Sequence, residues 1–385
     1  MLTKVVFKGF KSFKEETVID FAPSRIEYLS EENTYDGTLK GIAFYGANAS
    51  GKTNGLFAVT ILLDLLFKNG AIINQDTFCL FSAEKKISFE YTFRFEKDVL
   101  VYDFEFVRGK GFVKERLEEN GEPLLTRTLT SAKSHITENQ DYDEIDPGSL
   151  FIRSIFFNTR FAGRPLLLKW FNYLKNSIYF NPVRQYSQLV SFDRKNEGDV
   201  FLEPYLASHG TDEINDFLKE CGFPFTIEYI GPSKNDPFLN VTPFQMRLKV
   251  IRKGIGSVPF YMESMGSQML LAFLPAFLTV VKGGGILAID EFSSGLHNDL
   301  EELLVSYFFR HSKESQLVFV SHSTNLLKTS LIRPDQVYSV EFDQNGSYLA
   351  KFSEYGMRES QNMEKMYLAG AFGGIPNYEN PSASK

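Results

Sequence analysis

Cysteine is scarce in this chain, and its scarcity excludes two kinds of stabilising site. Only Cys79 and Cys221 occur among 385 residues, so neither a disulfide framework nor a four-cysteine zinc site is available. Long apolar runs are also lacking. The most apolar window, MLLAFLPAFLTVV at 269–281, is too short to span a bilayer and contains Pro275. No apolar segment of a signal peptide follows the lysines near the N-terminus. We therefore expect a cytoplasmic, reduced protein without a membrane contact.

The composition is that of a globular protein with a large core. Hydrophobic residues make up 43% and charged residues 23% of the chain, and its length suggests about two lobes. The formal net charge of -7 argues against wholesale coating of nucleic acid, although a local basic patch remains possible.

The order of apolar patterns predicts a mixed α/β architecture. Strands are expected near the N-terminus and at 41–45, a helix at 54–68, a β-meander at 87–117, a mobile polar loop at 131–147 and a capped helix at 211–222. After Met262 helix and strand alternate, which indicates a parallel sheet with crossover helices. We expect three parts: an N-terminal lobe at 1–130, a helical and basic insertion at 131–250 and a C-terminal lobe at 251–385.

The stretch FYGANASGKTN at 44–54 carries a glycine-rich loop of fixed spacing. It fits the pattern G-x4-G-K-[ST] after an apolar strand and before an apolar helix, which is the context that a phosphate-binding loop requires. Backbone N–H groups of such a loop turn toward phosphate oxygens, and the helix adds its positive end. Lys52 would reach the terminal phosphates, and the Thr53 hydroxyl would bind Mg²⁺. The candidate nucleotide-binding residues are Gly46, Asn48, Ala49, Ser50, Gly51, Lys52 and Thr53.

A second apolar strand, ILAIDEF, ends in two acids. Asp290 is a candidate second ligand of Mg²⁺, and Glu291 is a candidate for polarising the attacking water. An acidic pair at a strand end is also common on solvated surfaces, so the interpretation depends on the phosphate loop.

A third strand end and one helix start carry the remaining candidate residues. His322, in VFVSHSTNLL, is placed to contact the γ-phosphate or the water, although a lone histidine is more often a surface or core residue. The stretch YMESMGSQML has Ser264, Gly266 and Ser267 at a helix start, which is a second anion-binding position. A second anion-binding position in one chain has a use if it binds the nucleotide of another subunit.

Together these elements resemble the ABC-type ATPase head that transporters and SMC proteins share. The resemblance assigns Walker A to 46–53, the signature loop to 264–268, Walker B to 286–291, a D-loop to 293–300 and the switch histidine to His322. It implies an α/β P-loop ATPase head with an N-terminal β-meander lobe and a helical insertion, and without a coiled-coil arm.

More narrowly, the chain resembles compact SMC- and OLD-related AAA ATPases of abortive-infection type. The opening KVVFKGFKSFKEE, the Walker A style GANASGKTN and the ending YLAGAFGGIPN carry this resemblance. Departures are Met265 in the signature, Ser323 after the histidine, and Ala371 in the C-terminal ending. The Q-loop glutamine is either Gln185 or Gln188.

The resemblance implies that ATP and Mg²⁺ are the cofactors and that two subunits sandwich ATP head to tail. One hypothesis is an antiphage-defence ATPase that controls a separately encoded toxic effector, such as a nuclease. An alternative is an SMC-like ATPase that binds DNA in repair or maintenance, because residues 151–195 hold eight basic side chains against the single acid Asp193. A transporter subunit is a third and weaker option.

Overall fold

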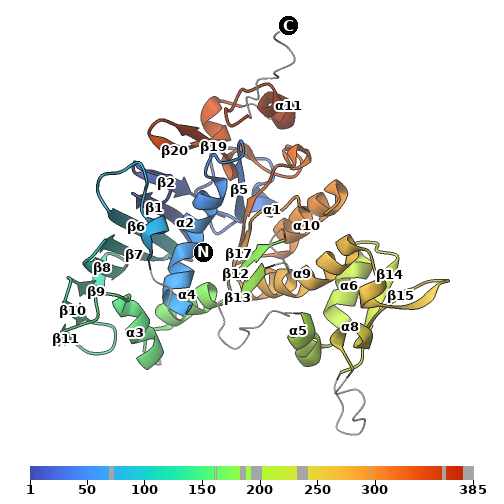
Figure 1. Cartoon of the computed structure of the whole chain (residues 1–385), viewed down its shortest axis with the longest axis horizontal. Helices are drawn as coiled ribbons and strands as arrows, with labels where there is room; N and C mark the ends of the chain where they lie inside the picture. The colour runs from blue at the N-terminus through green and yellow to red at the C-terminus, as the bar shows by residue number, and fades with distance from the viewer. Residues whose placement is uncertain are drawn as a thin grey trace.

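Two large β-sheets and the helices between and around them make up most of the molecule (Figure 1). The computed structural model describes residues 1–68, 73–159, 161, 163–182, 188–191, 202–231, 242–294, 296–357 and 361–375.

The N-terminal sheet is antiparallel and has eight strands in the order β11-β10-β9-β8-β7-β6-β1-β2. In β6 every second side chain from Ile87 to Phe95 is buried, which is the period-two pattern expected of the meander. The polar segment predicted as a mobile loop is instead the hairpin β10–β11, because it continues this sheet through pairing with β9. The strands are β1 (Leu2–Lys8), β2 (Thr17–Asp20), β6 (Lys86–Phe95), β7 (Asp98–Val107), β8 (Gly111–Glu119), β9 (Glu122–Arg127), β10 (Ser131–Ser134) and β11 (Gln140–Asp143).

The central sheet has seven strands in the order β13-β12-β17-β18-β5-β19-β20. The five inner strands are parallel, and the edge strands β13 and β20 run antiparallel to their neighbours. The parallel strands bring their carboxyl ends to one edge, where ligands of open α/β sheets bind. The strands are β5 (Gly41–Tyr45), β12 (Ile178–Asn181), β13 (Gln188–Ser191), β17 (Gly285–Ile289), β18 (Ser315–Val320), β19 (Val337–Asp343) and β20 (Gly346–Lys351).

Helices cover both faces of the central sheet and divide the core in two. On one face Phe44 and Val318 pack with α2 (Lys52–Phe67), α4 (Pro165–Lys175) and the eight-stranded sheet. On the other face Tyr45 and Phe319 pack with α9 (Met265–Gly283) and α10 (Asn298–His311). The alternation predicted after Met262 is therefore confirmed as α9-β17-α10-β18.

A smaller lobe follows the central strands β12 and β13. It consists of α5 (Leu202–His209), α6 (Asp212–Glu220), α8 (Phe244–Arg247) and the antiparallel sheet β14 (Phe225–Tyr229), β15 (Leu248–Arg252) and β16 (Gly256–Pro259). The boundaries expected for the insertion do not follow the sheets, since β10 and β11 belong to the first sheet and β12 and β13 to the central one. The remaining short elements are α1 (Ser30–Asn33), β3 (Thr34–Tyr35), β4 (Thr38–Leu39), η1 (Gln75–Thr77), α3 (Phe151–Asn158), η3 (Phe260–Met262), η4 (Thr324–Leu326), η5 (Pro334–Gln336), η6 (Phe352–Tyr355) and α11 (Met363–Leu368).

Helix α9 is longer than the apolar window in the sequence indicated. Its 19 residues give it the length and composition of a membrane span, but 61% of its most apolar window is buried inside the protein. Residues such as Leu271 and Phe277 are core residues of the second cluster. Burial of this kind is ordinary for a core helix, so length and composition alone are weak evidence for a membrane segment.

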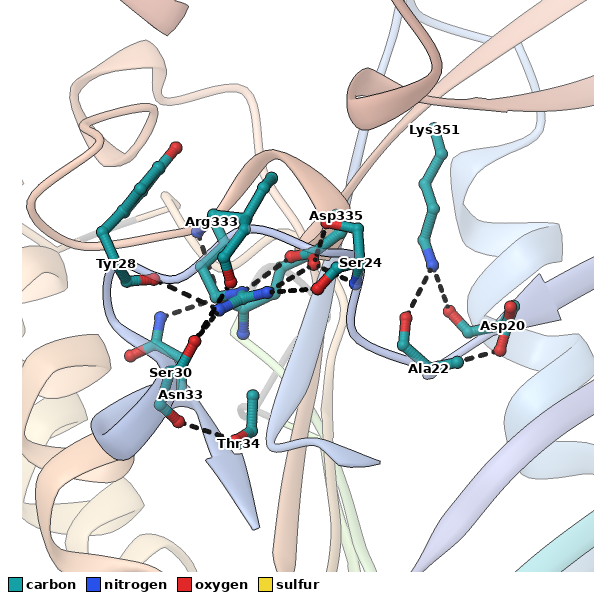
Figure 2. Close-up of polar contacts among 12 residues, drawn as sticks. Asp20, Ala22, Ser24, Tyr28, Ser30, Asn33, Thr34, Arg333, Asp335 and Lys351 are labelled. Atoms are coloured by element: carbon teal, nitrogen blue, oxygen red, sulfur yellow. Dashed lines mark hydrogen bonds and ion pairs between the residues drawn. The ribbon is translucent and has the colours of Figure 1, made fainter. Parts of the chain in front are cut away.

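A buried ion pair joins the N-terminal lobe to the end of the central sheet (Figure 2). Arg333 and Asp335 are both fully buried, and Arg333 Nη2 lies 2.7 Å from Asp335 Oδ2. The same guanidinium donates to the Tyr28 carbonyl (3.1 Å) and to Ser30 Oγ (2.6 Å), while Ser24 Oγ donates to Asp335 Oδ2 (2.7 Å). The loop at 22–33 is therefore attached to η5, directly before β19.

Candidate nucleotide site

The phosphate-binding loop lies where the sequence places it, between the fully buried strand β5 and helix α2. Its backbone requires glycine at two positions. Gly46 has φ +155° and a Cβ there would lie 2.4 Å from the Val340 carbonyl oxygen, while Gly51 has φ +109° and a Cβ there would lie 2.3 Å from Ser347 Oγ. The loop is therefore held against the C-terminal hairpin β19–β20 as well as its own helix.

Two polar side chains of the loop are arranged for an anion. The Lys52 ammonium donates to the carbonyl oxygens of Gly46 (3.0 Å) and Ala47 (2.8 Å). Burial lowers its pKa, and the nearby carboxylates of Glu291 and Asp290 oppose this shift. The Ser50 hydroxyl is buried and has no hydrogen-bond partner among the described residues. A bound phosphate group would supply an acceptor for both.

The two predicted Mg²⁺ ligands are in direct contact. Thr53 Oγ1 donates to Asp290 Oδ1 at 3.0 Å, across 237 residues of sequence. The other oxygen of Asp290 accepts from Asn181 Nδ2 (3.1 Å) and Tyr179 OH (3.4 Å) on β12. A hydroxyl and a carboxylate are the hard oxygen donors that Mg²⁺ prefers, so this pair fits the ion. Among the described residues no group of three or more His, Cys, Asp or Glu is placed to hold a metal.

Glu291 and His322 meet at the mouth of the same cleft. Glu291 has φ +58°, in the left-handed region, and its Oε2 lies 3.8 Å from His322 Nε2. Burial and the charge of Lys52 lower the pKa of His322, and the Glu291 and Asp290 carboxylates oppose them, so the ring is neutral at pH 7. The cleft has a volume of about 760 Å³ and is lined by Asn48, Ala49, Gly51, Lys52, Thr53, Asn54, Glu291, Ser294 and His322.

The predicted signature loop lies apart from this cleft. Ser264 caps α9, since its Oγ accepts from the Ser267 N–H at 3.2 Å. Ser264 is exposed, and Met265 beside it is 81% exposed. The described lining of the cleft contains neither Ser264 nor Gly266 or Ser267. Within one chain, therefore, the structure brings together Walker A, Asp290, Glu291 and His322 but not the signature.

Three polar residues that support the phosphate-binding loop were not predicted from the sequence. Asn54 Nδ2 donates to Ser12 Oγ (2.8 Å), Ser12 contacts Ser347 Oγ (2.7 Å), and Ser347 donates to the carbonyl of Ser50 (2.6 Å). Isolated serines carry no sequence signal of this kind. The sequence feature that comes closest to indicating Ser12 is the FKSF stretch after β1, because it belongs to the opening segment that resembles related ATPases.

The C-terminal ending also reaches the loop. A Cβ on Gly374 would lie 3.3 Å from the Gly46 Cα, so the ending packs at Gly374 against the first glycine of Walker A. Of the Q-loop candidates, Gln185 lies outside the described residues, and only the backbone of Gln188 is described, on β13.

Where the structure describes the basic segment 151–195, its basic side chains make contacts within the protein, although Arg164 and Lys169 stay about one third exposed. Arg153 donates to the Leu66 carbonyl at the end of α2, Arg164 to the carbonyls of Ile136 and His135, and Lys169 to Glu314. Its aromatic residues Phe161 and Tyr173 are buried. Arg160, Arg184, Arg194 and Lys195 lie outside the described residues. The described part does not form an exposed basic stripe.

Two solved structures share the fold. The SMC head domain from Thermotoga maritima is 15% identical, with a TM-score of 0.52, and the match covers 91% of this chain and 98% of that chain. A second, titled "Crystal structure of the SmcHead bound to the C-winged helix domain of ScpA", is 15% identical with a TM-score of 0.56, and the match covers 92% and 99% of the two chains. This likeness confirms the predicted ABC-type head.

No curated protein sequence matches the chain. The family model described as "AAA domain, putative AbiEii toxin, Type IV TA system" matches residues 42–328, more than half of the chain. The matched range includes Walker A, the signature, Walker B and the switch histidine. The chain belongs to this family of AAA-type P-loop ATPase domains.

Proposed function

We propose that this protein is a Mg²⁺-dependent ATPase that closes head to tail around ATP and thereby controls a separately encoded toxic effector in the cytoplasm. The observation that carries the ATPase part is the cleft. It joins the Walker A loop, the Thr53–Asp290 pair, Glu291 and His322 within about 760 Å³.

The residues divide the work of phosphoryl transfer to water. Lys52, the loop N–H groups and the Ser50 hydroxyl bind the phosphates, and Thr53 with Asp290 would hold Mg²⁺. When bound, the ion neutralises charge on the β- and γ-phosphate oxygens. Glu291 orients and polarises the attacking water, and neutral His322 donates a hydrogen bond toward the γ-phosphate.

Dimerisation follows from the separation of the signature from the cleft. Ser264 and the N-terminus of α9 are exposed and face no group of their own chain's cleft, which supports their use on the nucleotide of a second copy. ATP gripped by both subunits favours the closed dimer, and hydrolysis removes the γ-phosphate that both hold. Moving such an equilibrium from 1:99 to 99:1 takes about 5.5 kcal/mol of differential affinity.

Control of an effector is supported by the family and by one structural relative. The family description names a toxin of a toxin–antitoxin system. One SMC head of the same fold is bound to a domain of another protein, ScpA. Among the described residues no group of three or more His, Cys, Asp or Glu is placed to hold a nuclease-type metal, which supports assigning the toxic activity to a partner.

The alternative, an SMC-like ATPase that binds DNA, is supported by the shared head fold but not by the described part of the basic segment. A gel-shift titration at two salt concentrations separates the two, since phosphate contacts weaken steeply as salt rises.

Steady-state ATP hydrolysis tests the catalytic part of the proposal. We expect release of phosphate that requires Mg²⁺, is abolished by Lys52→Ala and falls by more than about 100-fold in Glu291→Gln. Equal rates in wild type and Lys52→Ala would contradict the proposal. Variant Glu138→Gln, on the described surface far from the nucleotide-binding motifs in sequence, serves as the charge-matched control.

A further inference from the structure

A second buried carboxylate lies close to the site without being part of it. Glu301, in the first turn of α10, is 0% exposed, and neither of its carboxylate oxygens has a hydrogen-bond partner among the described residues. Burial raises its pKa, and the Ser323 hydroxyl, which approaches the carboxylate without completing a hydrogen bond to it, opposes the rise without cancelling it. A buried carboxylate without partners is strongly unfavourable for folding.

Another buried carboxylate in this protein, that of Glu115, does have hydrogen-bond donors. Glu115 is 1% exposed, and its oxygens accept from Tyr102 OH (3.0 Å), the Phe151 N–H (2.7 Å) and the Ile152 N–H (2.7 Å). Glu301 is therefore an exception that needs an explanation in this molecule.

Glu301 lies beside the loop that carries His322. The main chain of this loop is held at two points, since Tyr45 OH donates to the Ser323 carbonyl (2.9 Å) and the Ser323 N–H donates to Ser321 Oγ (3.0 Å). The Ser323 hydroxyl donates to the side-chain oxygen of Asn325. The Ser323 hydroxyl therefore has two acceptors within reach. In this structure it donates to the neutral amide of Asn325 and leaves the Glu301 carboxylate unpaired.

The loop also connects the moving parts of the proposed switch. The His322 N–H donates to Ser293 Oγ in the predicted D-loop (3.3 Å), and Asn325 Nδ2 donates to the Asn298 carbonyl at the start of α10 (3.2 Å). A change of partner at Ser323 would shift the residue directly before it, which is His322.

We propose that Glu301 is a positioning residue for His322. In the nucleotide-bound protein the Ser323 hydroxyl leaves Asn325 and donates to Glu301, and the loop then holds His322 toward the γ-phosphate. A hydrogen bond to a charged acceptor is stronger than one to a neutral amide, so the exchange favours the catalytic position once Asn325 is released. This role rests on the proposed function, because it concerns the contact of His322 with ATP.

The test compares stability and catalysis in the same variants. Glu301→Leu removes an unpaired buried carboxylate, so we expect its Tm in the absence of nucleotide to rise or stay equal to that of wild type. Its kcat falls about 10- to 100-fold, as loss of one charge-assisted hydrogen bond implies, while KM for ATP changes less than about twofold. Glu301→Gln offers the Ser323 hydroxyl a neutral amide like that of Asn325, so the preference is lost and kcat should lie between those of wild type and Glu301→Leu.

Two further variants test whether the loss of kcat arises from the hydrogen bond between Ser323 and Glu301. Ser323→Ala lowers kcat as Glu301→Leu does, and the double variant is no slower than either single one, because both remove the same hydrogen bond. Glu115→Gln is the matched control: it disturbs a satisfied buried glutamate, so it lowers Tm and leaves kcat per folded molecule unchanged.

An unchanged kcat in Glu301→Leu overturns the proposal, as does a Tm that falls in that variant, since the carboxylate would then be paired in the free protein. Additive losses in the double variant overturn it as well. A wild-type rate no higher than that of Lys52→Ala overturns the proposed function and this role together, whereas a normal wild-type rate with an unaffected Glu301→Leu overturns this role alone.

Discussion

Individual residues of the nucleotide site are held by contacts from distant parts of the chain. Gly51 lies against Ser12 and Ser347, and Asp290 is bound by Thr53 and Asn181. That the Walker A residues, Asp290, Glu291 and His322 come together could be predicted from the sequence, because phosphate chemistry restricts both residue type and spacing. Their supports could not, because a serine or asparagine that bonds to a carbonyl leaves no pattern along the chain.

Removal of the Ser347 hydroxyl should loosen the Walker A loop. Ser347→Ala loses the 2.6 Å bond to the Ser50 carbonyl, and one such bond is worth about 0.5–1.5 kcal/mol, so the Kd for ATP should rise about 2- to 12-fold. Titration with a fluorescent ATP analogue measures this. Ser315→Ala is the control, because its hydroxyl donates to the Val280 carbonyl, at the far end of α9 from the signature, and its Kd should equal that of wild type. Equal losses in the two variants would show that the effect is not specific to the loop.

The pH dependence of hydrolysis should report on His322. Burial and Lys52 lower its pKa from 6.5, so the ring is neutral at pH 7 and gains a proton only on the acid side of 6.5. We expect kcat/KM, which reports on groups of the free enzyme, to be level near neutral pH and to fall at lower pH as this pKa is passed. The pH–rate profile of His322→Asn should have a lower kcat and should lack this acidic fall. An inflection that persists in the variant, or that lies above pH 7, would assign it to another group.

At the scale of elements, the periodic segments were predictable and the short polar ones were not. The meander β6–β8 and the series α9-β17-α10-β18 have long, regular apolar patterns that a sheet or a helix alone explains. The hairpin β10–β11 contributes only Ala132, Ile136 and Tyr142 to the apolar core, so its pairing with β9 depends on the neighbouring strand. The boundaries expected at 130 and 250 do not coincide with the sheets, because β10 and β11 continue the first sheet while β12 and β13 join the central one.

The link between the N-terminal loop and η5 should be essential for stability. In Arg333→Leu the buried Asp335 loses its cation, and breaking a buried ion pair costs about 3–5 kcal/mol. The double variant Arg333→Leu/Asp335→Leu removes both charges and should recover part of that loss. Urea denaturation measures both, and a loss below about 1 kcal/mol in the single variant would mean that the pair contributes little.

At the scale of the whole molecule, the central idea is that each active site is completed by a second copy. Lys52→Ala disables the cleft, and Ser264→Arg places a bulky cation at the exposed start of α9. Each variant alone should be inactive. Mixed in equal amounts they should regain hydrolysis, because a mixed head-to-tail dimer contains one intact composite site. Mixtures that remain as inactive as their components would argue against sharing of sites.

Sedimentation velocity of Glu291→Gln with Mg²⁺ and ATP tests this idea most directly. The variant should bind ATP without turning it over, so we predict a single species of twice the 43.9 kDa chain mass that reverts to monomer when ATP is replaced by ADP. A species that stays at one chain mass with saturating ATP would contradict it.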